Sequence, residues 1–153
     1  MCTPTTNGFG RFRPNALAPQ SILWGFDNRG AMLRVIGGPG DAATRIENRL
    51  GEPAANPYLY MAAQIYAGLA GLTQGMVPPP ATESPYAGDA SVQRIPANMG
   101  DALAALEADT AMCEGFGADF IRHYSCLKRA ELQRFEEAED PTEFQRREYF
   151  SRI

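Results

Sequence analysis

Three charged side chains recur at every second position in TRIENRL, residues 44–50. Arg45, Glu47 and Arg49 alternate there with mostly apolar residues. Alternate side chains of a β-strand share a face, so a strand here would place two guanidiniums and one carboxylate side by side. Such a face is either solvated, with its charges in a salt-bridge ladder, or it lines a polar cavity that binds anions and a metal. The pattern alone leaves both interpretations open.

Further arginines surround this stretch: Arg11 in an entry loop, Arg29 in a turn and Arg34 in an apolar segment. Residues 1–50 carry six Arg and three acids, a charge of +3, while residues 51–153 carry eight bases and fifteen acids, a charge of −7. Arginine suits bidentate recognition of phosphate and carboxylate better than lysine does. Several guanidiniums on one face repel each other unless an anion or carboxylate lies among them. The composition therefore favours a compact anionic ligand.

Other classes of function fit the chain less well. A pI near 5.0 and the absence of a dense Lys/Arg run argue against nucleic acid as a partner. No apolar run approaches the roughly 20 residues of a membrane helix, and the first twenty residues lack a secretory signal pattern, so we expect a cytoplasmic protein with no membrane partner. The three cysteines lack metal-binding spacing, and the single histidine, His123, sits within a helical pattern. A Ser/His/Asp triad is therefore not predicted.

The elements that would position the arginines are three short apolar strands over residues 20–50. The turn Asp27-Asn28-Arg29-Gly30 predicts an antiparallel hairpin between the first two, and GGPGD, residues 37–41, leads to the third. The segment is predicted to be an antiparallel meander. Its expected strands are 21–26, 31–36 and 44–50.

Helical patterns follow the strands. Asn56-Pro57 is a helix start, and the Ala-rich segment after it is apolar almost all round, which predicts a buried helix. Residues 76–96 form a Pro-rich connection that could wrap a surface or contact a neighbouring subunit. The expected helices are 58–72, 100–109, 116–138 and 142–150. Strands first and helices afterwards predict one α+β domain over residues 1–153, with helices on one face of an antiparallel sheet.

Nearly the whole chain resembles the C-terminal part of the catalytic domain of the glutamine synthetase family. The sequence motifs FRP, LAP and WGFDNR are most similar to those of the branch that couples glutamate to amines, such as γ-glutamyl-polyamine synthetases. The matching pieces are PTTNGFGRFRP (4–14), ALAP (16–19), WGFDNRGAMLRV (24–35), TRIENR (44–49), AANPYLYMAAQIYAGLAGL (54–72) and LKRAELQRFEEAEDPTEFQRREYF (127–150). The resemblance implies half of the family's catalytic barrel followed by packed helices.

The resemblance also implies a role for each candidate residue. Arg11 matches an arginine that holds the α-carboxylate of glutamate, and Arg49 matches another glutamate-binding arginine. Arg29 matches a catalytic arginine that contacts both the nucleotide phosphate and the γ-glutamyl group. The implied ATP-phosphate ligands are Arg29, Arg34 and Arg45, and the implied ligand of Mg²⁺ or Mn²⁺ is Glu47.

Two positions depart from the family pattern. Ammonia-using members carry a flap Glu where this chain has Leu17, which favours a bulkier or less polar amine as acceptor. A family lysine near the phosphates falls on Ala42, so phosphate binding would depend on arginine alone. The resemblance further implies that the family's N-terminal β-grasp domain and the first half of its catalytic domain, with the other metal-binding carboxylates, are missing.

The resulting prediction is the C-terminal fragment of an ATP-dependent ligase. Such a ligase joins the γ-carboxylate of glutamate to ammonia or an amine through γ-glutamyl phosphate. We expect the isolated chain to be inactive, and to form a homo-oligomer or to bind a complementing N-terminal half. The alternatives are a non-catalytic assembly or binding module and a gene remnant of such a ligase.

Overall fold

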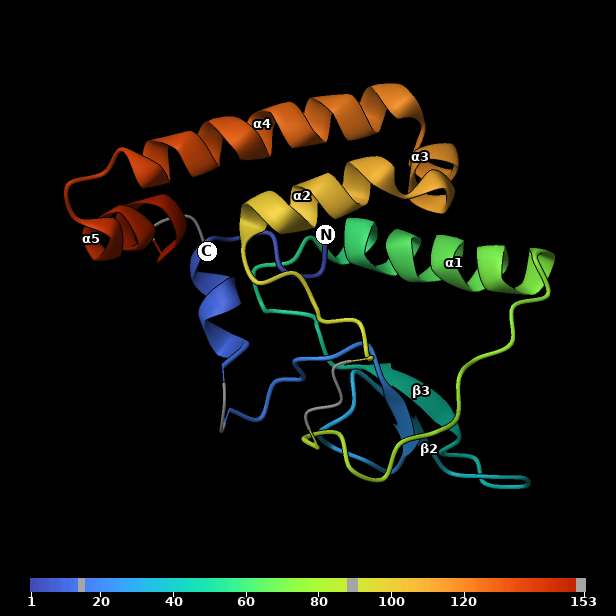
Figure 1. Cartoon of the computed structure of the whole chain (residues 1–153). Helices are drawn as coiled ribbons and strands as arrows, with labels where there is room; N and C mark the ends of the chain where they lie inside the picture. The colour runs from blue at the N-terminus through green and yellow to red at the C-terminus, as the bar shows by residue number, and fades with distance from the viewer. Residues whose placement is uncertain (14–15, 88–90, 151–153) are drawn as a thin grey trace. The chain divides into compact units, whose positions relative to one another are not determined.

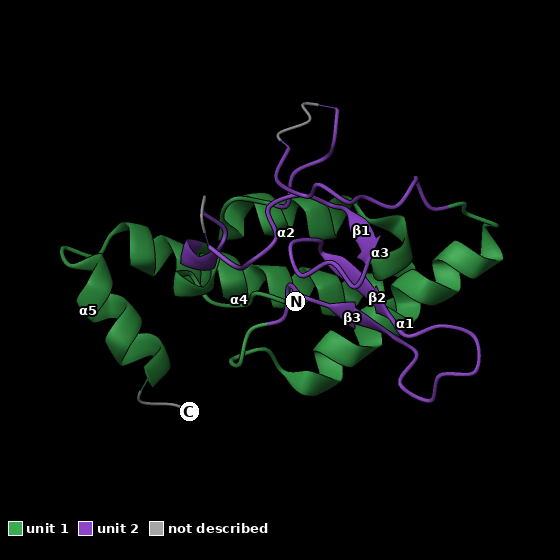
Figure 2. Ribbon diagram, turned by 90° about the horizontal axis from the view of Figure 1, so that it is seen from below, with its two compact units in different colours: residues 1–9, 52–77, 96–153 green, residues 10–51, 78–95 purple. Residues whose placement is uncertain are grey.

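The computed structural model describes residues 1–13, 16–87 and 91–150, and it divides the chain into two compact units (Figures 1 and 2). Unit 1 comprises residues 1–9, 52–77 and 96–153, and unit 2 comprises residues 10–51 and 78–95. The end of the PTTNGFGRFRP motif and part of the Pro-rich connection fall outside the described residues. Helices build unit 1 and a small sheet builds unit 2, so the predicted α+β class is confirmed.

Unit 1 is a packed set of helices. Helix α2 packs against α3 and α4, while α3 also contacts α1 (Figure 1). Its core includes Met99 and Leu103 of α2, Ile121 of α4 and Ala63 of α1. The helices are α1 (Pro57–Thr73), α2 (Met99–Ala108), α3 (Thr110–Phe116), α4 (Ala118–Glu136) and α5 (Pro141–Gln145), followed by the π-helix η2 (Arg146–Phe150).

Side-chain caps fix the starts of these helices. The Asn56 side chain accepts hydrogen bonds from the backbone N–H groups of Tyr58 and Leu59, and Pro57 occupies the first turn, as predicted from Asn56-Pro57. Asn98 and Asp140 cap α2 and α5 in the same way. Each cap supplies acceptors to backbone donors that have no partner inside the helix.

Two helix predictions need correction. The helix expected over 116–138 begins at Ala118, because Gly117, with φ of 86°, ends α3 and separates it from α4. Helix α1 is not buried as expected. Only Ala63 is buried in it, and its apolar surface is largely exposed, because the helices of unit 1 contact only part of its circumference.

Unit 2 holds a three-stranded sheet of β1 (Trp24–Phe26), β2 (Leu33–Ile36) and β3 (Arg45–Asn48). Strands β2 and β3 pair antiparallel, as predicted. Strands β1 and β2 pair parallel, so the predicted hairpin between them, and with it the fully antiparallel meander, is wrong.

The connection between β1 and β2 explains the parallel pairing. Asp27 has a φ of 46°, and the Asn28 side chain accepts a hydrogen bond from Gly30 N at 3.0 Å, so the turn itself forms. The chain then continues past this turn to the start of β1, where Leu33 N donates to Leu23 O at 3.0 Å. A six-residue loop therefore carries β2 back to run in the same direction as β1.

The Pro-rich connection packs along β1 and its turn. Trp24 Nε1 donates to Pro79 O at 2.6 Å, and Asn28 Nδ2 donates to Thr82 O and Glu83 O at 3.2 Å each. A Cβ on Gly30 would lie 2.5 Å from Pro85 Cγ, so only glycine allows this approach. Of the two roles expected for this segment, wrapping a surface fits these contacts, and contact with a neighbouring subunit stays an untested expectation.

Candidate anion-binding site

One face of the β2–β3 pair carries the charged residues. Arg34 and Glu47 are paired in register, and Nη1 of Arg34 lies 3.4 Å from Oε2 of Glu47. Arg49 follows two residues after Glu47, and its Nε lies 3.8 Å from the same oxygen. The expectation that alternate residues of TRIENRL share a face therefore holds for Glu47 and Arg49, and both lie beside the Arg34 side chain.

The opposite face of the same sheet is apolar. Trp24, Leu33, Val35 and Ile46 line a hollow of about 320 Å³ there. The charged and apolar sides thus follow from the two-residue period of β2 and β3. This separation leaves the guanidiniums on a polar side of the sheet.

Asp27 joins the charged group, although the sequence pattern assigned it only to a turn. Its Oδ1 accepts a hydrogen bond from Nε of Arg34 at 3.0 Å, and Nη2 of Arg34 pairs with the same oxygen. This contact lowers the pKa of the Asp27 carboxyl and, together with Glu47, raises the pKa of Arg34. No sequence spacing marks this pair, because it depends on the unexpected course of the β1–β2 connection.

Arg49 has unused hydrogen-bonding capacity. Its Nη2 donates to Leu17 O at 3.4 Å, while its Nη1 is buried and has no hydrogen-bond partner among the described residues. A buried, unsatisfied guanidinium nitrogen is costly unless a ligand supplies an acceptor. Arg34, Glu47 and Arg49 thus form a compact group of two guanidiniums around one carboxylate.

The other predicted site residues lie apart from this group. Arg11 donates to Leu50 O at 2.7 Å and to Gly51 O at 3.1 Å, just beyond the end of β3. Arg45 is exposed and donates to Ala43 O at 2.8 Å. Arg29 is exposed in the turn after β1. The structure therefore brings together three of the six predicted residues.

A divalent cation does not fit the described residues on their own. Glu47 is a single carboxylate held between two guanidiniums, and the described part of the chain contains no cluster of three or more His, Cys, Asp or Glu side chains. Mg²⁺ and similar ions need several oxygen ligands in close to octahedral geometry. Any further protein ligands must come from residues outside those described.

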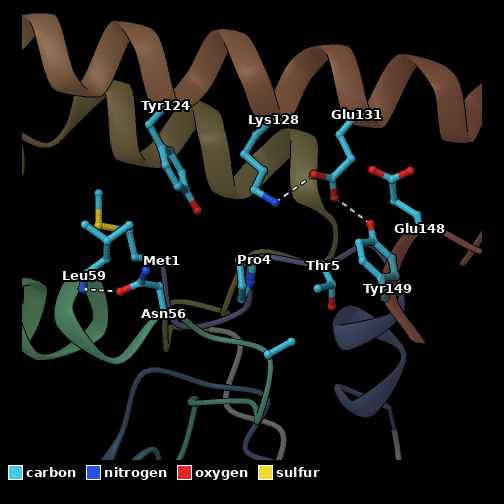
Figure 3. A pocket seen from close by; sticks show the side chains of 11 residues that line it. Met1, Pro4, Thr5, Asn56, Leu59, Tyr124, Lys128, Glu131, Glu148 and Tyr149 are labelled. Carbon is cyan, nitrogen blue, oxygen red and sulfur yellow. Dashed lines mark hydrogen bonds and ion pairs between the residues drawn. The ribbon is translucent and has the colours of Figure 1, made fainter. Parts of the chain in front are cut away.

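Unit 1 contains a separate cavity of about 320 Å³, whose lining includes several charged and phenolic side chains (Figure 3). Glu131 accepts hydrogen bonds there from Tyr149 Oη at 2.6 Å and from Lys128 Nζ at 2.8 Å. Tyr149 Oη also accepts one from Thr6 N at 3.0 Å. These bonds join α4, η2 and the N-terminal segment, so their evident role is structural.

Two tyrosines of this cavity have shifted acidities. Burial raises the pKa of Tyr124 to about 12. Burial, with the hydrogen bond to Glu131, raises the pKa of Tyr149 to about 12. Both phenols therefore stay protonated to a higher pH than an exposed tyrosine does. The Lys128–Glu131 spacing of three residues was the only sign of this group in the sequence.

The helices in the described part of the chain include none with the length and apolar character needed to cross a membrane.

Residues 1–147 match the family model described as the catalytic domain of glutamine synthetase. The γ-glutamylanilide synthase of Acinetobacter sp is 43% identical over 97% of this chain and 31% of its own length. The γ-glutamylethanolamide synthetase GlnA4 of Streptomyces coelicolor is 34% identical over 100% of this chain and 32% of its own length. A solved structure titled as a GmaS/ADP complex matches with a TM-score of 0.75 and 31% identity, over 98% of this chain and 35% of that chain. The chain thus spans about a third of the length of these relatives.

Proposed function

The chain belongs to the glutamine synthetase catalytic-domain family, and from this premise we propose that it supplies the C-terminal part of an ATP-dependent glutamate–amine ligase. The observation that carries the proposal is the charged face of β2 and β3. There, Arg34 and Arg49 flank Glu47, and the buried Nη1 of Arg49 lacks a partner among the described residues. We interpret this face as a binding surface for a polyanionic substrate and not as a solvated salt-bridge ladder.

Each residue of the charged face would act on a defined group. Arg34 binds phosphate oxygens of the nucleotide, and Arg49 binds glutamate. When the γ-carboxylate attacks the terminal phosphoryl group, negative charge on the transferring oxygens must be stabilised, and fixed guanidiniums do this with little reorganisation. A divalent metal, when bound, would neutralise further phosphate charge, with Glu47 as this chain's contribution to its ligands.

The remaining arginines complete the proposed substrate site. Arg11 is held at the end of β3 by two backbone carbonyls, which fixes it for a glutamate carboxylate. Arg29 and Arg45 are exposed and could reach nucleotide phosphates from a turn and from the start of β3. Arg29 would in addition contact the γ-glutamyl group.

The acceptor is proposed to be an amine with an apolar substituent. Leu17 O accepts a hydrogen bond from Arg49, which ties the Leu17 segment to the charged group, while the Leu17 side chain is 80% exposed. An apolar side chain here favours a substituted amine over ammonium. The names of two relatives, a γ-glutamylanilide synthase and a γ-glutamylethanolamide synthetase, support this choice.

A chimera tests the proposal. Residues 1–153 replace the aligned third of the Acinetobacter γ-glutamylanilide synthase, and ADP release is measured with glutamate and aniline. We expect amine-dependent turnover from the chimera and none from the isolated chain. The matched control is the same chimera with Arg34→Ala, which should lose turnover while retaining its melting temperature. An inactive but folded chimera would contradict the proposal.

One observation favours a second candidate, a non-catalytic assembly module. The chain covers only a third of its relatives, yet α1 exposes a row of large apolar side chains. Co-expression with the first two thirds of a relative distinguishes the two candidates. Restored ligase activity supports a split enzyme, and a stable inactive complex supports an assembly role.

A further inference from the structure

Asp27 has the only positive φ of a non-glycine residue in the described part of the chain, at 46°. Its backbone is fixed there, since Asp27 N donates to Val35 O at 2.8 Å and so continues the pairing of β1 with β2. The left-handed region is unfavourable for a residue with a Cβ, whereas glycine occupies it freely. Aspartate tolerates this conformation better than most residues do. A carboxylate held in such a conformation points to a role for the side chain itself.

The Asp27 carboxylate binds one edge of the Arg34 guanidinium. Its Oδ1 accepts a hydrogen bond from Nε at 3.0 Å and also pairs with Nη2. Nη1 of Arg34 is the nitrogen on the other side, where Glu47 Oε2 lies 3.4 Å away. Glu47 is shared, because the same oxygen lies 3.8 Å from Nε of Arg49. Asp27 is therefore the carboxylate that holds Arg34 by two nitrogens and fixes the plane of its guanidinium.

Folding stability alone does not account for this ion pair. The Asp27 side chain is 76% exposed, whereas that of Arg34 is 17% exposed. An ion pair with one partner so exposed contributes little to folding, because water competes for the charge and ordering the side chains costs entropy. A fixed guanidinium does matter where it must meet a phosphate. A donor that is already oriented stabilises developing charge without reorganising.

We propose that Asp27 is a positioning residue, which clamps the Nε–Nη2 edge of Arg34 and leaves the Nη1 end to meet a phosphate oxygen. This inference rests on the proposed ligase function, in which Arg34 binds the nucleotide. Asp27 raises the rate of phosphoryl transfer and not the affinity for ATP. The orientation it imposes is used in the transition state, while its negative charge repels the phosphates of the bound nucleotide.

Steady-state kinetics of the chimera with the Acinetobacter synthase test this role. Asp27→Gly and Asp27→Asn both tolerate the backbone conformation, but glycine removes both contacts and asparagine keeps only a neutral acceptor. We expect kcat to fall roughly tenfold or more in Asp27→Gly and by a smaller factor in Asp27→Asn, with no rise in KM for ATP. Asp119→Asn is the matched control. It breaks an exposed pair of 2.9 Å with Arg122 in unit 1 and should keep both constants.

The outcomes separate this inference from the proposed function. Wild-type kcat in both Asp27 variants, or a raised KM for ATP with unchanged kcat, would overturn the positioning role and leave the ligase function standing. Loss of kcat together with a large fall in melting temperature would show that Asp27 only supports the local structure. An inactive chimera with the wild-type sequence would instead contradict the proposed function.

Nitrogen-15 NMR of the 153-residue chain tests the clamp without catalysis. Rotation about the Nε–Cζ bond of Arg34 should be slow while Asp27 holds both Nε and Nη2, so its two Nη signals should be resolved. Arg34→Gln identifies these signals by their loss. They should merge in Asp27→Gly and stay resolved in Asp119→Asn. Merged signals in the wild-type chain, or resolved signals in Asp27→Gly, would overturn the proposal.

Discussion

Arg34 and Glu47 occupy paired positions of β2 and β3 and are joined by an ion pair of 3.4 Å between Nη1 and Oε2. Asp27 neutralises the other edge of the same guanidinium. An incoming anion must therefore compete with two carboxylates for Arg34, while Nη1 of Arg49 remains without a partner among the described residues. The resting state of the proposed site is thus an internally neutralised cluster.

Glu47→Gln is expected to strengthen the metal-free binding of inorganic pyrophosphate. Removing the carboxylate between Arg34 and Arg49 ends its repulsion of the ligand and releases Nη1 of Arg34 and Nε of Arg49. At a partly exposed site this amounts to roughly 1 kcal/mol, up to about fivefold in Kd. Titration calorimetry of the 153-residue chain measures the change.

Arg34→Gln should act in the opposite direction. Loss of one charge-assisted contact weakens pyrophosphate binding by roughly tenfold or more. Arg146→Gln is the control, because Arg146 forms an exposed pair with Glu143 on α5 in the other unit. Weaker binding in Glu47→Gln, or equal losses in the two arginine variants, would refute the cluster as an anion site.

Asn28→Ala is expected to loosen the Pro-rich segment from β1. Thr82 O and Glu83 O lose their donor and Gly30 N loses its acceptor, at a cost of about 1–2 kcal/mol. Trp24, the single tryptophan, donates to Pro79 O and so reports on this contact. Its fluorescence should shift to longer wavelength as the segment opens.

Asn98→Ala provides the comparison for Asn28→Ala. Loss of the Asn98 side chain removes the N-cap of α2 and lowers the free energy of unfolding by about 1 kcal/mol. Asn98 lies in unit 1, whereas Trp24 lies in unit 2. The Trp24 emission maximum should therefore stay unchanged in the native state. A shift of similar size in both variants would mean that Trp24 reports only general destabilisation.

Local chemistry made some features predictable from the sequence. The Asn56-Pro57 start of α1 depends on one side chain and its neighbouring N–H groups, and the shared face of Glu47 and Arg49 depends only on strand period. Both therefore appear as expected. The position of Arg34 beside Glu47 and Arg49 follows from the antiparallel pairing of β2 and β3, which the sequence also predicted.

Features that depend on distant segments were not predictable in the same way. The turn at Asp27 and Asn28 forms as its residues dictate, but the direction of β2 is set by the later course of the chain. The apolar sequence of α1 indicated burial, yet a sequence does not specify which faces its own chain covers. The ion pair of Asp27 with Arg34 could not be predicted, because it depends on the direction of β2.

Tyr149→Phe is expected to lower the free energy of unfolding by about 1–3 kcal/mol. The substitution leaves the buried Glu131 carboxylate and Thr6 N without the phenolic oxygen that joins them. Urea denaturation followed by circular dichroism measures the loss. Tyr58→Phe removes a hydroxyl from a side chain that is 78% exposed and should leave stability unchanged.

Stability should also fall at high pH. The ordinary tyrosine pKa is 10.0, and burial raises that of Tyr124 and Tyr149 to about 12. Above pH 10 the unfolded chain releases these protons first, so the stabilisation is complete below pH 10 and is lost as the pH rises through 12. Phenolate absorption should show three tyrosines titrating above the ordinary value, Tyr60, Tyr124 and Tyr149, and two in Tyr149→Phe. Simultaneous titration of all tyrosines in the folded chain would contradict this.

Leu17→Glu is expected to change acceptor preference in the active chimera. Arg49 holds Leu17 O, so a glutamate at this position would lie near the charged group and could attract ammonium. The ratio of kcat/KM for ammonium to that for aniline should rise by roughly tenfold, the effect of one favourable charge contact of about 1.4 kcal/mol. Leu17→Met keeps an apolar side chain and should keep the preference for aniline. Equal losses for both acceptors in Leu17→Glu would show that Leu17 supports the local structure and does not select the amine.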